Sequence, residues 1–265
     1  DAIFSQWNPK APGGVLTVVR RDQTIYNSAF GMADLEHNIA NTHETVFEAG
    51  SVSKQFTAAA ILLLVQDGKL SLDDDIRKYL PEVPDFGTPI TIRHLLTHTA
   101  GLSYDFLQPE SGPYNTIPVS AGIDGDFTME DNLNRMVQAG LTFPPGAMWL
   151  YSVAIDVLGA ILAKAEGADV EGAVKKHVTG PMQMTDTSFF VTDETRLVQP
   201  YSNSAPEPVR IGDNFKQPFV PGCAPINLGV SRAFNRHAFQ GGGGCMNGKA
   251  MDIVRMLDAI RAGGE

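Results

Sequence analysis

Hydrophobic positions along the chain predict a short β-hairpin followed by a series of helices. Two β-prone runs at 15–19 and 25–30, separated by the polar residues 20–23, predict an antiparallel pair of strands. Apolar residues then recur at helical spacing over 51–67, ahead of Gly68, and they occupy nearly every side of the helix, which is therefore expected to be buried. Further helical patterns occupy 92–97, 129–139, 153–165 and 249–262.

Two long segments lack such a pattern. Residues 103–125 are rich in Gly, Pro, Ser, Asp and Tyr, and loops of this length in compact domains are usually functional or mobile. Residues 199–232 are rich in proline and asparagine and are expected to be mostly irregular. The four glycines at 241–244 lack the Lys-Ser/Thr of a phosphate-binding loop, so we interpret them as a close backbone crossing near the floor of a site.

Composition narrows the class of protein. The chain has 265 residues, enough for one compact unit or two subdomains that share a cleft, and its 43% hydrophobic and 19% charged residues are typical of a globular enzyme. A net charge of −10 without a Lys/Arg-rich run argues against a nucleic acid partner. The longest apolar stretch, 58–65, is too short to span a bilayer. No leader is visible in this chain, so both a cytoplasmic and a periplasmic location stay open.

Neither a metal site nor a disulfide framework is expected. Cys223 and Cys245 lack zinc-site spacing, and the sequence leaves open whether they form one bond or stay reduced. His94 and His98 have the spacing of two metal ligands, but no third ligand accompanies them, so a structural role at a helix end is expected. The aspartates at 73–75 are interpreted as the solvated start of a helix, and no cofactor is predicted.

One motif carries candidate chemistry. Ser51 and Lys54 form the only Ser-x-x-Lys of the chain, directly after Gly50 and at the predicted first turn of the long helix. Free N–H groups and the helix dipole favour negative charge at that position. Burial would lower the pKa of the Lys54 ammonium and leave an amine able to take a proton from Ser51. The alternative is that Ser51 only caps the helix and Lys54 extends to solvent. No Gly-x-Ser-x-Gly occurs, which excludes an α/β-hydrolase elbow.

The surroundings of this motif resemble the active-site segment of class C β-lactamases and their esterase and peptidase relatives. The resemblance begins with Phe-Glu-Ala-Gly-Ser-Val-Ser-Lys-Gln-Phe-Thr at 47–57 and continues, in the family's order, through 68–74, 92–102 and 145–152. It implies an α/β (α+β) fold of the β-lactamase/transpeptidase type, with an antiparallel sheet flanked by helices and a mostly helical subdomain. Residues 1–90 and 190–265 would form an incomplete sheet subdomain and residues 91–189 the helical one, with the active site at their junction.

The resemblance also implies roles for individual residues. Ser51 would be the nucleophile, and Tyr151, in the position of the family's Tyr-x-Asn tyrosine, would take its proton together with Lys54. The alternative for Tyr151 is a core tyrosine. Val153 replaces the asparagine that orients a lactam's amide, so the site is expected to be more apolar. The segment 151–159 resembles β-lactamase-like carboxylesterases (family VIII esterases), which favours a small or medium acyl ester as substrate.

Two other activities stay open: a β-lactamase or D-amino-acid peptidase with the same machinery, and a catalytically silent binding module. Tyr104, Trp149 and Val153 are predicted to bind substrate, and Phe106 and Tyr114 are further candidates for the pocket wall.

The resemblance implies one element that no residue of this chain matches. The family carries a Lys-Thr-Gly, His-x-Gly or Trp-Gly-Gly triplet on a late strand, whose backbone N–H completes the oxyanion hole. A two-stranded sheet alone is marginal in water, and its open edge invites pairing. We therefore expect the remaining strands to be supplied by a second polypeptide.

Overall fold

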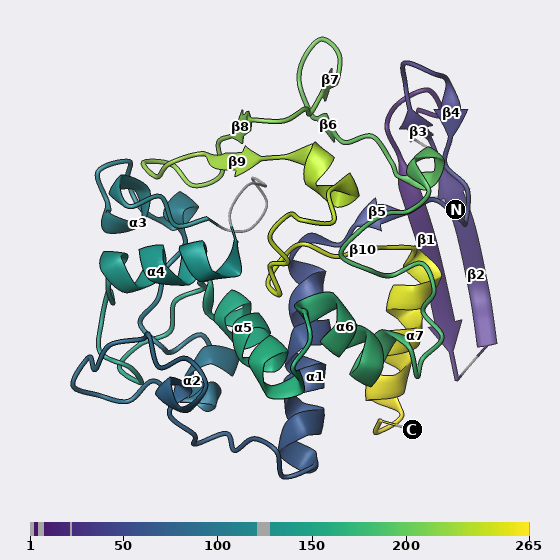
Figure 1. The fold of residues 1–265 in the computed structure, drawn as a ribbon. Coiled ribbons are helices and arrows are strands. Elements are labelled where there is room, and N and C mark those ends of the chain that lie inside the picture. The colour runs from purple at the N-terminus through teal and green to yellow at the C-terminus, as the bar shows by residue number, and fades with distance from the viewer. Residues whose placement is uncertain (1–2, 5–7, 22, 121–127, 265) are drawn as a thin grey trace.

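The structure is a computed structural model that describes residues 3–4, 8–21, 23–120 and 128–264 (Figure 1). Its helices are α1 (Ser53–Gln66), α2 (Ile92–Leu96), α3 (Pro113–Thr116), α4 (Met129–Ala139), α5 (Ala154–Glu166), α6 (Val170–Val174) and α7 (Ala250–Arg261). Its strands are β1 (Gly14–Arg20), β2 (Gln23–Phe30), β3 (Met32–Asp34), β4 (Ile39–Ala40), β5 (Phe47–Glu48), β6 (Tyr201–Ser202), β7 (Val209–Arg210), β8 (Phe215–Gln217), β9 (Ile226–Leu228) and β10 (Asn247–Gly248).

The predicted N-terminal hairpin is confirmed. Strands β1 and β2 pair antiparallel from Gly14 opposite Phe30 to Arg20 opposite Gln23, with a register shift between Val18 and Val19. The hairpin stands at one side of the molecule, and α7 packs against β1 (Figure 1). The helix predicted over 249–262 is confirmed as well; Met256 is buried on it, whereas Leu257 and Ile260 are exposed.

Helix α1 runs through the centre of the molecule, and α5 and α6 pack against it (Figure 1). Phe56, Ile61 and Leu64 on α1 are fully buried in the main hydrophobic core. The prediction of burial on every side is wrong, because Leu62 is 47% and Leu63 is 36% exposed on the opposite face. Leu62 and Leu63 therefore lie on a part of α1 that the packing of α5 and α6 leaves exposed.

The remaining helices follow the sequence pattern closely. α4 has the predicted bounds, and its N-terminus is closed by a capping box in which Thr128 and Asp131 bond to each other's backbone. The loop predicted at 103–125 contains the short helix α3 and a 3-10 turn, Asp105–Leu107, in its described part, while residues 121–125 lie outside the described residues. The division into a sheet subdomain and a helical subdomain stays a prediction.

The segment 199–232 is more ordered than predicted. It forms two small antiparallel hairpins, β6 with β7 and β8 with β9. Each strand has only two or three residues, too few for an alternating apolar pattern to emerge from a proline-rich sequence. Main-chain hydrogen bonds to the rest of the protein fix their position, including Ala224 N–H donating to the Gln108 carbonyl at 2.9 Å.

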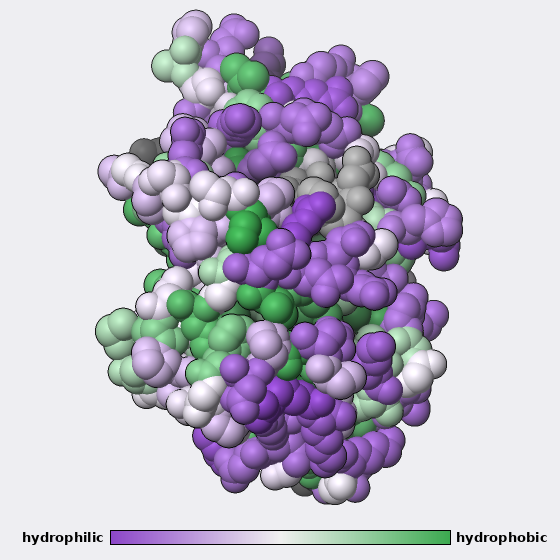
Figure 2. All heavy atoms as spheres, turned by 60° about the vertical axis from the view of Figure 1, so that its left-hand side comes forward, coloured by the Kyte–Doolittle hydropathy of each residue, from purple (hydrophilic) through white to green (hydrophobic). Residues whose placement is uncertain are grey.

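The surface is uneven in hydropathy. Figure 2 shows a mainly hydrophilic face in which hydrophobic residues gather in a band across the middle. Among the described helices, none has both the length and the apolar character needed to span a membrane.

Candidate active site

Two short strands position the candidate nucleophile. β5 pairs antiparallel with β10, and Ala49 N–H extends the pairing by donating to the Met246 carbonyl at 2.8 Å. Gly50 then turns the chain with φ +49°, a left-handed conformation that glycine adopts without strain. Ser51 follows in a single 3-10 turn, Gly50–Val52, at the start of α1. The turn leaves Ser51 accessible while its neighbour Ser53 is fully buried.

The three predicted catalytic side chains converge. The hydroxyl groups of Tyr151 and Ser51 are 2.6 Å apart, although the residues are 100 positions apart in the sequence. Lys54 Nζ lies 4.6 Å from the centre of the Tyr151 ring and donates a hydrogen bond of 2.5 Å to the Gly243 carbonyl. Ser51, Lys54 and Tyr151 all line the same cavity.

The glycine segment 241–244 crosses directly beneath this site, as predicted. Thr57 on α1 donates to the Gly242 carbonyl at 2.9 Å, and a Cβ atom added to Gly242 would lie 2.9 Å from that same hydroxyl oxygen. At Gly243 an added Cβ would lie 2.6 Å from Asp156 Oδ2. Side chains longer than hydrogen do not fit between α1 and α5, so the glycines allow the backbone carbonyl to reach Lys54.

Asp156 is a residue of this site that the sequence analysis missed. It lies on α5, is 2% exposed, and accepts a 2.9 Å hydrogen bond from Gly243 N–H. Burial raises its pKa to about 6, although the positive charge of Lys54 and the Gly243 N–H act in the opposite direction. It is the only charged residue in the apolar run 153–162, a signal that pointed to a buried carboxylate.

The cavity above Ser51 has a volume of about 460 Å³, within the range typical of small-molecule sites. Its walls are formed by twelve residues: Glu48, Gly50, Ser51, Lys54, Tyr104, Phe106, Tyr151, Phe219, Ile226, Leu228, Gly243 and Gly244. Tyr104 and Phe106 are thus placed as predicted. Sequence reasoning missed the contribution of β9 and of Phe219, because these residues come from the segment that was expected to be irregular.

Three predicted substrate-binding residues lie outside this cavity. Val153 is 2% exposed at the start of α5, where it belongs to the hydrophobic core. Trp149 is 65% exposed, and its ring meets the His98 ring edge-on at 6.3 Å. Tyr114 is fully buried, and its hydroxyl donates to the Gly140 carbonyl. None of these three residues lines the cavity that contains Ser51, and their contact with substrate stays a prediction.

The two histidines of the 94–98 segment have structural positions. His94 accepts a hydrogen bond from Thr91 N–H in the capping box of α2. His98 adopts a positive φ of 54°, and its Nδ1 is 3.3 Å from the Ser152 hydroxyl. Burial, helped by the charge of Lys54, lowers the pKa of His98 to about 4. Among the described residues, no group of three potential ligands could hold a metal ion. Cys223 and Cys245 do not form a disulfide bond.

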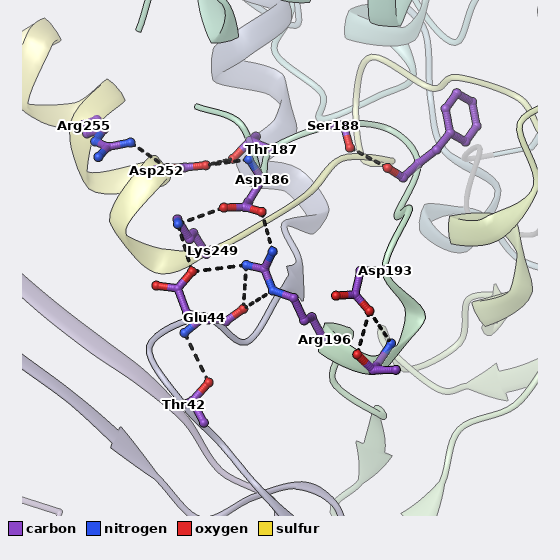
Figure 3. Close-up of polar contacts among 12 residues, drawn as sticks. Thr42, Glu44, Asp186, Thr187, Ser188, Asp193, Arg196, Lys249, Asp252 and Arg255 are labelled. Atoms are coloured by element: carbon purple, nitrogen blue, oxygen red, sulfur yellow. Dashed lines mark hydrogen bonds and ion pairs between the residues drawn. The ribbon is translucent and has the colours of Figure 1, made fainter. Parts of the chain in front are cut away.

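A network of ion pairs holds the strands that carry Ser51 (Figure 3). Asp186 accepts from Arg196 at 2.6 Å and pairs with Lys249 at 2.8 Å, and Lys249 also reaches Glu44 at 3.1 Å. Glu44 precedes β5, and Lys249 follows β10. Because the pair is antiparallel, the start of β5 lies beside the end of β10, and the network therefore joins this one end of the pair to the segment after α6.

The sequence matches the Beta-lactamase family over residues 3–264. The chain belongs to this family of serine hydrolases, and its fold is the β-lactamase-type α/β fold that the motifs predicted.

Proteins similar to this chain include two that are named as esterases and a hydrolase of known structure. Esterase EstB of Burkholderia gladioli is 39% identical over 271 residues, covering 99% of this chain and 69% of EstB. The solved structure described as EstCE1, a hydrolase with promiscuous acyltransferase activity, superposes with a TM-score of 0.92 at 36% identity and covers 97% of this chain and 69% of that one. A lovastatin esterase of Penicillium rubens is 26% identical over 262 residues, 90% of this chain and 61% of the fungal protein.

These relatives bear on the expectation of a second polypeptide. Because EstB and EstCE1 each match this chain with 69% of their length, the rest of each relative belongs to the same polypeptide as the matched part. The expectation that a separate polypeptide supplies further strands has no support from them.

Proposed function

We propose that this protein is a carboxylesterase that forms an acyl-enzyme on Ser51 with small or medium acyl esters. The observation that carries the proposal is the 2.6 Å contact between the Tyr151 and Ser51 hydroxyl groups, with Lys54 beside the Tyr151 ring. A nucleophile within hydrogen-bond reach of a base, with a third group that orients and charges the base, is the arrangement that activates a serine. The similarity to EstB and EstCE1 supports an ester as the substrate.

The reaction uses these groups in two stages. The Ser51 oxygen attacks the ester carbonyl while its proton passes to Tyr151, and the Lys54 ammonium favours the negative charge that Tyr151 carries as base. We assign the Ser51 N–H, in the 3-10 turn ahead of α1, as a donor to the developing oxyanion. Tyr151 then gives its proton to the departing alcohol. Water, activated by the same pair, attacks the acyl-enzyme and releases the acid, which restores Ser51.

Two features favour an ester over an amide substrate. Val153 has no polar group that could hold the amide of a lactam side chain, and it is buried away from the cavity. The cavity lining also includes Phe106, Phe219, Ile226 and Leu228, whose side chains offer apolar contact only. β-Lactamase or D-peptidase activity with the same machinery is the second candidate, and a silent binding module is the third.

The proposal is tested by comparing a p-nitrophenyl butyrate assay with hydrolysis of a chromogenic cephalosporin. We expect the ester to be the better substrate, and a fluorophosphonate to label Ser51. Tyr151→Phe is expected to lower kcat for the ester by about 10²–10⁴ because it removes the general base. Tyr79→Phe is the matched control, since its hydroxyl bonds Asp74 away from the cavity.

Three results would contradict parts of this assignment. Full activity of Ser51→Ala excludes Ser51 as the nucleophile. Faster turnover of the cephalosporin favours the second candidate. A folded protein that neither hydrolyses the ester nor reacts with the fluorophosphonate favours the binding module.

A further inference from the structure

Four aromatic rings form a row that leads away from the catalytic serine. The Tyr151 ring lies 5.3 Å from that of Tyr104, which stacks on Phe106 at 4.7 Å. Phe106 in turn meets Phe219 edge-on, with ring centres 5.7 Å apart and an interplanar angle of 90°. All four rings line the cavity that contains Ser51. The row therefore makes one continuous aromatic wall that starts at the nucleophile.

The hairpin β8–β9 supplies the facing apolar surface. Ile226 and Leu228 are two positions apart on β9, so their side chains point to the same side of the strand. Both line the cavity. The hairpin is anchored near the aromatic row by the hydrogen bond from Ala224 N–H to the Gln108 carbonyl. The cavity is thus polar around Ser51 and Lys54 and apolar at its far end.

Phe219 has a special position in this row. It lies in the loop between β8 and β9, and 62% of its surface is exposed. A large apolar side chain that is both exposed and in contact with a cavity wall marks the mouth of the cavity. Packing against Phe106 holds the ring there without burying it in the core.

We propose that the apolar half of this cavity binds the unbranched hydrocarbon chain of the acyl group, and that Phe219 determines the preferred chain length. This inference rests on the proposed esterase function. The acyl group stays bonded to Ser51 through both stages of the reaction, whereas the alcohol leaves after the first. A wall that begins at Tyr151 and extends to the mouth suits the group that is retained.

The test measures kcat/KM for p-nitrophenyl esters from acetate to decanoate, in which only the acyl chain changes. We expect the wild-type value to rise about fourfold for each methylene that is buried, until the chain reaches Phe219. Phe219→Ala is expected to lower the ratio of kcat/KM for octanoate to that for acetate about tenfold, the equivalent of nearly two buried methylenes. Phe219→Trp is expected to move the preference to shorter chains.

Val209→Ala is the matched control, because Val209 is 50% exposed on the neighbouring β6–β7 hairpin and does not line the cavity. Equal losses for acetate and octanoate in Phe219→Ala, or a wild-type profile without chain-length dependence, overturn the inference and leave the esterase function standing. A Phe219 effect seen only when the alcohol of n-alkyl acetates is lengthened overturns the assignment to the acyl chain. If wild-type protein hydrolyses no ester, the proposed function and this inference both fail.

Discussion

The buried carboxylate beneath the catalytic lysine makes stability depend on pH in an unusual direction. Burial raises the pKa of Asp156 to about 6 from the ordinary value of 3.8. The folded protein therefore holds a proton that the unfolded chain releases, and stability is lost as pH rises from about 4 to about 6. A shift of this size corresponds to about 3 kcal/mol of unfolding free energy at neutral pH.

Replacing Asp156 with asparagine removes this titration. The Asn oxygen can still accept the Gly243 N–H, so the glycine segment keeps its bond. Relative to wild type, the unfolding free energy of Asp156→Asn is expected to increase by about 3 kcal/mol between pH 4 and pH 7. Urea denaturation of both proteins at pH 4, 5, 6 and 7 measures this difference directly.

Asp67→Asn is the matched control, since Asp67 is exposed at the end of α1 and the substitution removes the same charge. The reasoning is refuted if the difference between Asp156→Asn and wild type stays constant over this pH range, or if it falls as pH rises. Either result would mean that Asp156 is already ionised at low pH in the folded protein.

Three further predictions concern single residues. Hydrogen bonds from Lys176 hold the pKa of Glu166 at about 2. In urea titrations, Glu166→Gln is therefore expected to lower the free energy of unfolding by about 1–3 kcal/mol at pH 7, and this loss is expected to shrink as the pH falls below 4.5. In Gly243→Ala the new Cβ would lie 2.6 Å from Asp156 Oδ2. This substitution is expected to lower the unfolding free energy by about 1–3 kcal/mol, and an unchanged urea midpoint would contradict the close approach of the glycine segment to α5. His98, whose pKa burial lowers to about 4, is expected to stay neutral down to that pH in an NMR titration, and a midpoint near 6.5 would contradict its burial.

Local sequence patterns were sufficient to predict those features of the fold that depend on residues close together in the chain. The hairpin at the N-terminus, the helices α4, α5 and α7, and the serine and lysine one helical turn apart all follow from side-chain periodicity within a short stretch of chain. Gly50 ahead of Ser51 and the glycines at 241–244 were also interpreted correctly, because only glycine meets the backbone demands of those positions.

Local sequence patterns could not predict contacts between segments that lie far apart in the chain. The β8–β9 hairpin was not predicted because its strands are too short to show an alternation of apolar and polar residues. Phe219, Ile226 and Leu228, which belong to this hairpin and line the pocket, were therefore not predicted either. Val153 was assigned to substrate from its place in the family's Tyr-x-Asn triplet and Trp149 as an aromatic residue within the family's motifs, yet the Trp149 side chain is exposed and that of Val153 lies in the core. Sequence neighbours of an active residue need not share its cavity.

The amino-acid sequence by itself therefore determined the order of helices, the first hairpin and the chemical types available for catalysis, since these depend on residues a few positions apart. The family resemblance predicted the role of Tyr151, and the tertiary structure brings its hydroxyl to 2.6 Å from that of Ser51, 100 positions away. Tertiary structure alone decided that Asp156 holds a proton near pH 6 and that the cavity is apolar at one end. Proximity, burial and cavity shape are properties of surfaces brought together from the whole chain, and no single segment contains them.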